Sequence, residues 1–384
     1  MYSDEYLRKL NFKFRKTFGG RMSENFWKKV AIFMVNVGKV PFPISDNLIN
    51  FIQAKLTEEQ AKFILIFKNH SINLEQIKKK SDLSEVEILK MLENLMDNGI
   101  IAGYSDEKTG IINYTLMALF PGIIEYTFAK GDQGEKEEKL ATLVENIILE
   151  LRNGVQKNYD TIMPQIKMFP AVERIIHIEE SIPAGQEVVL LTENAFKIID
   201  QNENIALIHC YCKQEKYLTK DPCKITNNRD ICLLLGDSAK FSVKHNFAKL
   251  ISKEEAKIIL REAEDLGLVH KIFKSDLNYG RTIDGICSCC KCCCGVFRYY
   301  HNGTWPYQTV TSYIAKVDSD LCSGCGVCVE KCPMENITLQ NDVATLDNKC
   351  IGCGVCAHNC QDDAIELFRT GPRNVFVPIQ KLEI

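Results

Sequence analysis

The sequence feature that most constrains this chain is a pair of cysteine runs near its C-terminus. They read Cys322-x2-Cys325-x2-Cys328-x3-Cys332 and Cys350-x2-Cys353-x2-Cys356-x3-Cys360. A short apolar stretch follows each run, at residues 337–339 and 364–367, so the chemistry and the local structure repeat together. Three thiols at two-residue intervals in a tight loop can ligate one side of a metal cluster, and a fourth ligand must then come from elsewhere.

The two runs resemble those of bacterial ferredoxins that bind a pair of [4Fe-4S] clusters. In that family the fourth cysteine of each run ligates the other cluster. Glycines beside the cysteines (324, 326, 352 and 354) are expected to let backbone amides approach the sulfurs. One departure is Gln361, which stands where the family usually has proline. The resemblance implies one cluster on Cys322, Cys325, Cys328 and Cys360, and a second on Cys350, Cys353, Cys356 and Cys332.

Ten more cysteines lie upstream, since the chain has 18 in all and eight belong to the two runs. Neighbouring cysteines in the dense run at 287–294 point to different sides, so the run serves more than one site or one large cluster. One or two further Fe–S clusters are the favoured interpretation. Structural zinc, and a redox-active or persulfide-carrying thiol group, are the alternatives. The candidate ligands are Cys210, Cys212, Cys223, Cys232, Cys287, Cys289, Cys290, Cys292, Cys293 and Cys294.

Residues 205–295 also resemble a segment of multidomain ferredoxin-type proteins of strict anaerobes. There an apolar strand leads into a C-x-C pair, and a cysteine-rich run precedes the ferredoxin motifs. Lys213 departs from that pattern, in which arginine is common. Cys293-Cys294-Gly295 is similar to the CCG tripeptide of heterodisulfide reductase subunits, which hold non-cubane clusters, although the flanking spacings differ. His209, His245 and His270 are expected at the surface or behind the ligands.

Residues 57–116 predict three helices followed by a hairpin. Thr57 with Gln60 and Ser84 with Glu87 have the spacing of capping boxes. The pattern resembles a winged helix-turn-helix domain. Its third helix carries four acidic residues against one lysine between positions 84 and 98, so phosphates would repel it and DNA binding is not expected. A structural or protein-contact role is favoured.

The fold class expected is multidomain α+β. The boundaries are a helical N-terminal region at 1–56, a winged-helix-like domain at 57–116, a helical connector at 117–171, an α/β cysteine-rich domain at 172–300, a two-cluster ferredoxin domain at 313–370 and a tail at 371–384.

Composition and charge indicate the compartment of the protein and the kind of partner that it contacts. The start of the chain has no apolar signal segment and no stretch long enough to span a bilayer, so we expect a cytoplasmic protein whose thiols stay reduced. Residues 313–368 hold three lysines against nine acidic residues, which suits docking on a basic redox partner. No nucleotide or zinc-protease motif is present.

The leading function predicted is electron transfer through the two clusters, to or from the upstream cysteine site or a partner oxidoreductase. The alternatives are a redox-responsive winged-helix regulator and an oxidoreductase with its active site at Cys210–Cys294. Whether the chain is itself an enzyme, and its oligomeric state, stay open at this point.

Overall fold

The computed structural model describes residues 26–38, 40–68, 71–106, 108–169, 171, 173–178, 194–273 and 283–383. Residues 179–193 of the predicted cysteine-rich domain and the first 25 positions of the predicted N-terminal region lie outside these residues. Within them the chain mixes helices with three sheets. None of the described helices is long and apolar enough to cross a membrane.

The first half of the chain is mainly helical. Its helices are α2 (Phe26–Val37), α3 (Asp46–Lys55), α4 (Glu58–Ile64), α5 (Leu74–Lys78), α6 (Glu85–Asp97), α7 (Ile123–Phe128), α8 (Glu135–Lys157) and α9 (Tyr159–Ile166). Its strands are β1 (Ser71–Asn73), β2 (Ile101–Ser105) and β3 (Ile112–Leu116), which form one sheet in the order β1-β3-β2.

Side chains at the helix starts explain why these helices begin where they do. The boxes predicted at Thr57 and Ser84 are both present, and each side chain accepts the backbone amide three residues on. Asn73 starts α5 in the same way, and this cap was not predicted from the sequence. Strand β1 also adds to the predicted order of three helices and a hairpin, because Ser71–Asn73 pairs with β3.

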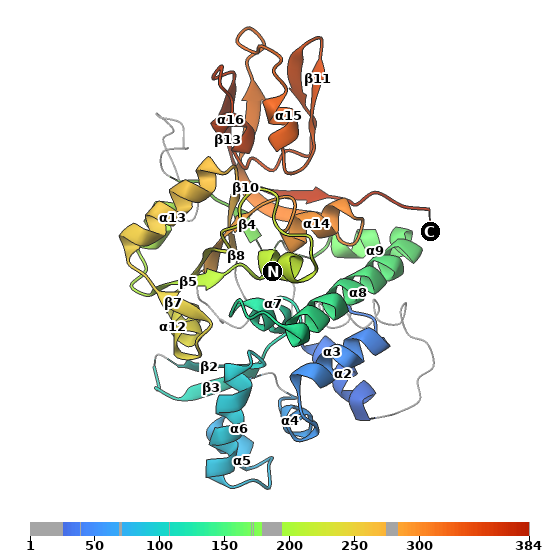
Figure 1. The fold of residues 1–384 in the computed structure, drawn as a ribbon, viewed down its shortest axis with the longest axis vertical. Helices are drawn as coiled ribbons and strands as arrows, with labels where there is room; N and C mark the ends of the chain where they lie inside the picture. The colour runs from blue at the N-terminus through green and yellow to red at the C-terminus, as the bar shows by residue number, and fades with distance from the viewer. Residues whose placement is uncertain are drawn as a thin grey trace.

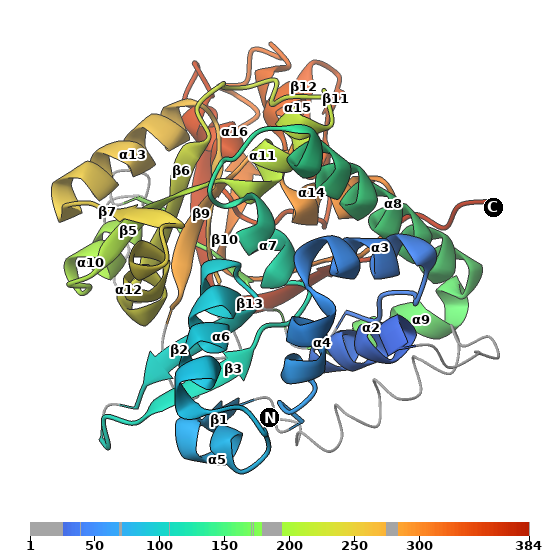
Figure 2. The ribbon, with the colours of Figure 1, turned by 60° about the horizontal axis from the view of Figure 1, so that its bottom comes forward.

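One apolar core joins these elements to each other and to later parts of the chain. Helix α8 packs against α3 and against the later helix α11 (Tyr211–Leu218), as Figure 2 shows for α3. Phe241, Phe247 and Tyr299 belong to the same core although they come from the cysteine-rich half. His245 Nδ1 also lies 2.7 Å from Asp97 Oδ1 at the end of α6. The helical part and the cysteine-rich part of the chain therefore share one hydrophobic core.

The second half is built on an eight-stranded sheet with the order β13-β10-β4-β8-β9-β6-β5-β7. The strands are β4 (Glu173–Ile175), β5 (Ile205–His209), β6 (Asp230–Leu235), β7 (Ala248–Leu250), β8 (Val269–Phe273), β9 (Gly285–Cys289), β10 (Tyr307–Val317) and β13 (Ile365–Val377). The helices are α10 (Ala195–Asp200), α11 (Tyr211–Leu218), α12 (Gly236–Lys244), α13 (Lys253–Asp265) and α14 (Gly295–His301).

The sheet differs from the α/β domain expected at 172–300. All its described pairs are antiparallel except β4 with β10. An α/β sheet is built from parallel strands joined by crossover helices, whereas here β8 and β9 are sequential antiparallel neighbours. This part of the chain is α+β.

The ferredoxin region is attached to this sheet through β10 and β13, which pair along most of their length (Figure 1). Between them lie two short helices, α15 (Val327–Lys331) and α16 (Val355–His358), and a hairpin of β11 (Ile337–Gln340) and β12 (Val343–Leu346). Strand β13 continues to Val377. Residues 371–377 therefore belong to the sheet and not to the predicted tail, because they pair with the start of β10.

Candidate metal centre

Two cavities lie in the ferredoxin region, and each is lined by four cysteines. One is lined by Cys322, Cys325, Cys328 and Cys360. The other is lined by Cys332, Cys350, Cys353 and Cys356. Each cavity thus takes three cysteines from one run and the fourth from the other run, which is the grouping that crossed ligation requires.

The backbone around these cavities has the features that an iron–sulfur cluster needs. Gly324 and Gly352 adopt positive φ angles of 72° and 64°, and an added Cβ would lie 2.4 Å from the Asp342 carbonyl oxygen and 2.0 Å from that of Tyr313. Only glycine fits such positions. The amide of Gly352 donates to Cys350 Sγ at 3.4 Å. Amide donors to sulfur are a known means of tuning cluster potential.

Burial raises the pKa of the Cys353 thiol well above its ordinary value. A thiol in that environment gives up its proton only to a strong Lewis acid, and thiolate ligands are what an iron–sulfur cluster requires. The donor set, the cavities and the glycine-lined loops all fit two [4Fe-4S] clusters.

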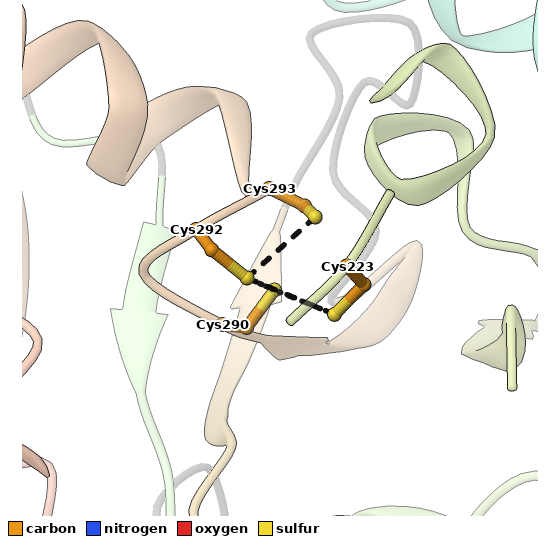
Figure 3. Close-up of side chains that lie close together, drawn as sticks. All are labelled: Cys223, Cys290, Cys292 and Cys293. Carbon is orange, nitrogen blue, oxygen red and sulfur yellow. Dashed lines mark hydrogen bonds between the residues drawn. The ribbon is translucent and has the colours of Figure 1, made fainter. Parts of the chain in front are cut away.

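The ten upstream cysteines come together in the fold, and they divide into two groups. The first group, which we call the tetrathiol site, consists of Cys223, Cys290, Cys292 and Cys293 (Figure 3). Cys223 comes from the loop after α11, and the other three come from the turn between β9 and α14. Their four sulfur atoms all lie within 4.8 Å of one another.

The sulfur spacing of the tetrathiol site fits a single metal ion. Cys292 Sγ lies 3.5 Å from Cys290 Sγ, 3.7 Å from Cys293 Sγ and 3.7 Å from Cys223 Sγ. A tetrahedral ion with metal–sulfur bonds of about 2.3 Å separates its ligands by about 3.8 Å. A four-iron cube holds its cysteines farther apart, because each sulfur binds a different iron. Among the described residues, no other three cysteines gather their sulfurs within 4.8 Å.

The remaining six upstream cysteines form a closed circuit, which we call the six-thiol ring. Each side chain has the next one around the ring as its neighbour, and the last has the first. In order around the ring they are Cys210, Cys212, Cys294, Cys289, Cys287 and Cys232. Adjacent cysteines in the dense run thus separate, because Cys289 joins the ring and Cys290 joins the tetrathiol site.

Sheet register explains how the ring is assembled. Leu233 on β6 lies opposite Ile286 on β9, so one residue further along Cys232 faces Cys287. Residues opposite each other on antiparallel strands project from the same face. The next strand, β8, places Lys271 opposite Cys287 on that face.

A buried ion pair lies beside the ring. Lys271 Nζ is 2.8 Å from Glu173 Oε2, and both side chains are less than one tenth exposed. The same ammonium group lies 3.8 Å from Cys294 Sγ. Burial alone would lower the pKa of Lys271, but the neighbouring Cys289, Cys294 and Glu173 raise it well above its ordinary value. A positive charge is therefore fixed against the ring.

Neither member of this pair was predicted from the sequence. Lys271 occupies the middle of the strand Val269–Phe273, where a lysine is normally assigned to the solvent face. A lysine among otherwise apolar strand residues was the available signal. Of the histidines expected at the surface or behind the ligands, His245 and His270 are buried, at 1% and 3% exposure, so the surface placement is wrong for these two. His270 bonds to Ser288 Oγ on the opposite face of the sheet from the ring.

The ferredoxin cavities lie against the upstream cysteines. Cys294 of the ring and Cys350 of the nearer cavity belong to the same apolar cluster. Lys291, which lies between two tetrathiol cysteines in sequence, reaches Glu335 Oε1 at 3.3 Å. His301 Nε2 lies 2.8 Å from the carbonyl oxygen of Pro333, next to Cys332. The cavity containing Cys332 is thus the one that faces the upstream sites.

Comparisons with known proteins bear on the ferredoxin region alone. Residues 321–365 match the family model of the 4Fe-4S dicluster domain. A stretch of 35 residues is 54% identical to a probable ferredoxin of Methanosarcina thermophila and covers 9% of this chain and 60% of that protein. A stretch of 33 residues is 58% identical to protein Pixie of Drosophila melanogaster, over 9% of this chain and 5% of that protein. No solved structure matches the chain.

The matched stretches span less than two thirds of either relative, and the remainder of this chain lies outside them. The cysteine spacing, the paired cavities and the family match agree on residues 321–365. This part of the chain is a ferredoxin-type iron–sulfur domain, and a domain of this type implies a redox partner.

Proposed function

We propose that this protein is an electron carrier in which two [4Fe-4S] clusters exchange electrons with the upstream cysteine sites or with a partner oxidoreductase. The observation that carries the proposal is the pair of cavities that each combine three cysteines of one run with one cysteine of the other. When bound, the clusters supply one-electron redox chemistry.

The ligand sets belong to this proposal. One cluster takes Cys322, Cys325, Cys328 and Cys360, and the other takes Cys350, Cys353, Cys356 and Cys332. The second of these two sites, next to Pro333 and His301, is the inner one and faces the upstream cysteines. Electrons from an outside donor then enter at the outer site and pass inward.

The surface charge supports a docking partner with a basic face. The ferredoxin segment at 313–368 has nine acidic residues and three lysines. Fields of opposite sign steer two redox proteins into contact and raise the association rate. We assign this docking to a reducing compartment, the cytoplasm, where cysteines stay reduced and remain able to ligate metal.

We assign residues 57–116 to a winged-helix-like domain that makes protein contacts. Helix α6 would be its recognition helix, and it carries Glu85, Glu87 and Glu93 toward the exposed side. Lys78 on α5 is paired with Glu75 at 3.2 Å and with Glu85 at 2.7 Å. The positive charge of Lys78 is therefore partly neutralised, which weighs against the alternative of a redox-responsive DNA-binding regulator.

A second candidate function has one observation in its favour. The buried ion pair Lys271–Glu173 beside the six-thiol ring is a costly feature that a plain electron wire does not need. Perturbed buried groups of this kind gather at active sites. An oxidoreductase with its reaction at the ring would use the two ferredoxin clusters as its electron supply.

The test of the proposed function is a redox titration of the anaerobically purified full-length chain, followed by EPR. Two reduced [4Fe-4S] clusters in the ferredoxin region are expected to give about two spins per chain, with the line broadening of two clusters held close together. Zinc in these eight positions, or fewer than eight irons per chain, would remove the proposal.

A further inference from the structure

We propose that the six-thiol ring is the site of an eight-iron cluster, made of two four-iron cubes joined through one bridging atom and held by six thiolates. The proposal rests on the proposed function for its iron–sulfur chemistry. It adds the nuclearity and the ligand set of a third cluster site, separate from the ferredoxin clusters and from the tetrathiol site.

The six cysteines of the ring form a closed set. Each of the six cysteines has two thiol neighbours within the ring, so none is left over and none is shared with the tetrathiol site. The four cysteines of the tetrathiol site are complete by themselves, with a spacing suited to one ion. The ten upstream cysteines therefore describe two sites of different size.

The sulfur atoms of the ring lie too far apart to ligate a single ion. No three of these six described cysteines have their sulfurs within 4.8 Å of one another. In the tetrathiol site all four do. Ligands of one tetrahedral ion must gather mutually, so a ring in which only neighbours meet encloses something larger than one ion.

The number of thiols in the ring equals the number of irons in two joined cubes that need an outside ligand. A single cube has four irons and needs four thiolates, which would leave two buried thiols facing the cluster without a metal. When two cubes share one bridging atom, each uses one iron for the bridge and keeps three for outside ligands. The total is six, which is the number of thiols in the ring.

The ring cysteines are carried by regular backbone elements. Cys232 and Cys287 stand opposite each other on two central strands, and Cys289 follows two residues later on the same face of β9. Cys212 lies in the first turn of α11, and Cys294 is the N-cap residue of α14. Ligands on paired strands and at the starts of helices have little conformational freedom, and a rigid multinuclear site requires this.

A buried positive charge and a backbone amide lie beside the ring. Six thiolates with their irons carry net negative charge, and reduction adds more. Lys271 supplies a buried positive charge 3.8 Å from Cys294 Sγ. The amide of Gly295 donates to Cys212 Sγ at 3.1 Å. Both groups stabilise a negative cluster, and the partner carboxylate Glu173 holds Lys271 in position.

The test is a comparison of iron and sulfide contents in the reconstituted full-length chain and in the variant Cys287→Ala/Cys289→Ala. The matched control is Ser288→Ala, since Ser288 lies between the two cysteines and faces His270 on the other side of the sheet. We expect the double variant to contain about eight fewer irons than wild type, while the control loses none. A difference of four irons, as for one cube, or of none overturns the proposal.

The same measurement separates this proposal from the proposed function. Failure of the ferredoxin assignment appears as missing iron in the double variant, which is expected to keep about eight irons from the two [4Fe-4S] clusters. If the double variant does not fold, the wild-type chain still decides. Its total is expected to be about sixteen irons, apart from one ion at the tetrathiol site, and about twelve contradicts the eight-iron cluster.

Discussion

The Nζ atom of Lys271 lies 2.8 Å from Glu173 Oε2, in a pair that is buried beside the six-thiol ring. Strand register produces this contact, because Glu173 and Lys271 stand on the paired strands β4 and β8, two positions apart in register. The pair also contacts the aromatic ring of Phe297, whose centroid is 4.8 Å from the ammonium nitrogen. A lysine that the sequence places in an ordinary strand is thus a fixed charge inside the protein.

Replacing this lysine alone is expected to destabilise the fold. Lys271→Met leaves the Glu173 carboxylate buried without its cation, which costs about 3–5 kcal/mol for a broken buried pair. The matched control is Lys271→Met/Glu173→Leu, in which both charges are removed, and which is expected to recover most of that loss. Urea unfolding of the holo-protein measures both. Equal stability of the single variant and wild type would contradict the role of the pair.

Crossed ligation makes the two fourth cysteines specific for different clusters. Cys360→Ala is expected to damage the cluster of the first run while the EPR signal of the other cluster persists. Cys332→Ala is expected to do the reverse. Each variant serves as the control for the other. Loss of the cluster formed by a cysteine's own run would show that each run closes on itself.

The tetrathiol site is expected to hold one ion that is independent of the clusters. Cys223→Ala removes one of four ligands, so one equivalent of zinc or iron is lost per chain, while the iron of the ferredoxin clusters stays. Elemental analysis of the purified variant beside wild type measures this directly. A loss of four irons would mean that the four cysteines hold a cube.

Acid is expected to weaken the junction between the sheet and the ferredoxin loop. Burial lowers the pKa of His177 to about 4. In the unfolded chain a histidine titrates near 6.5, so below that pH the unfolded state binds more protons than the folded state. Stability contributed by neutral His177 is present above pH 6.5 and is lost as the pH falls.

Between pH 7.5 and 5.5 this histidine is expected to remove about 1 kcal/mol of unfolding free energy. His177→Phe, which keeps a ring against Tyr313, should lose less over the same interval. His358→Phe is the matched control, because that side chain is one third exposed. Unfolding midpoints at the two pH values give the comparison, and equal losses in His177→Phe and wild type would refute the assignment.

Local patterns allowed part of this molecule to be predicted. The caps at Thr57 and Ser84 involve contacts three residues apart, and the cysteine repeats are similarly local. The three helices expected between residues 57 and 116 are present as α4, α5 and α6. A ferredoxin-type domain at the C-terminus follows from spacing alone, and the family match supports it.

Long-range pairing decided what could not be predicted. The split of the dense run depends on Cys289 ending a strand and Cys290 entering the turn that follows it. The contact between Glu173 and Lys271 joins residues 98 positions apart. The extension of β13 to Val377 depends on its pairing with Tyr307, at the far end of a different strand. None of these follows from local propensity, because each is fixed by sheet register.

The most direct test of the electron-transfer account is rapid-freeze EPR of the full-length chain after mixing with a one-electron reductant. The account predicts that the ferredoxin clusters become reduced first and that the upstream site then gains electrons at their expense. In Cys332→Ala, where the inner cluster is damaged, the second step is expected to slow by at least tenfold while the outer cluster is reduced normally. Upstream reduction at the wild-type rate in that variant would contradict the account.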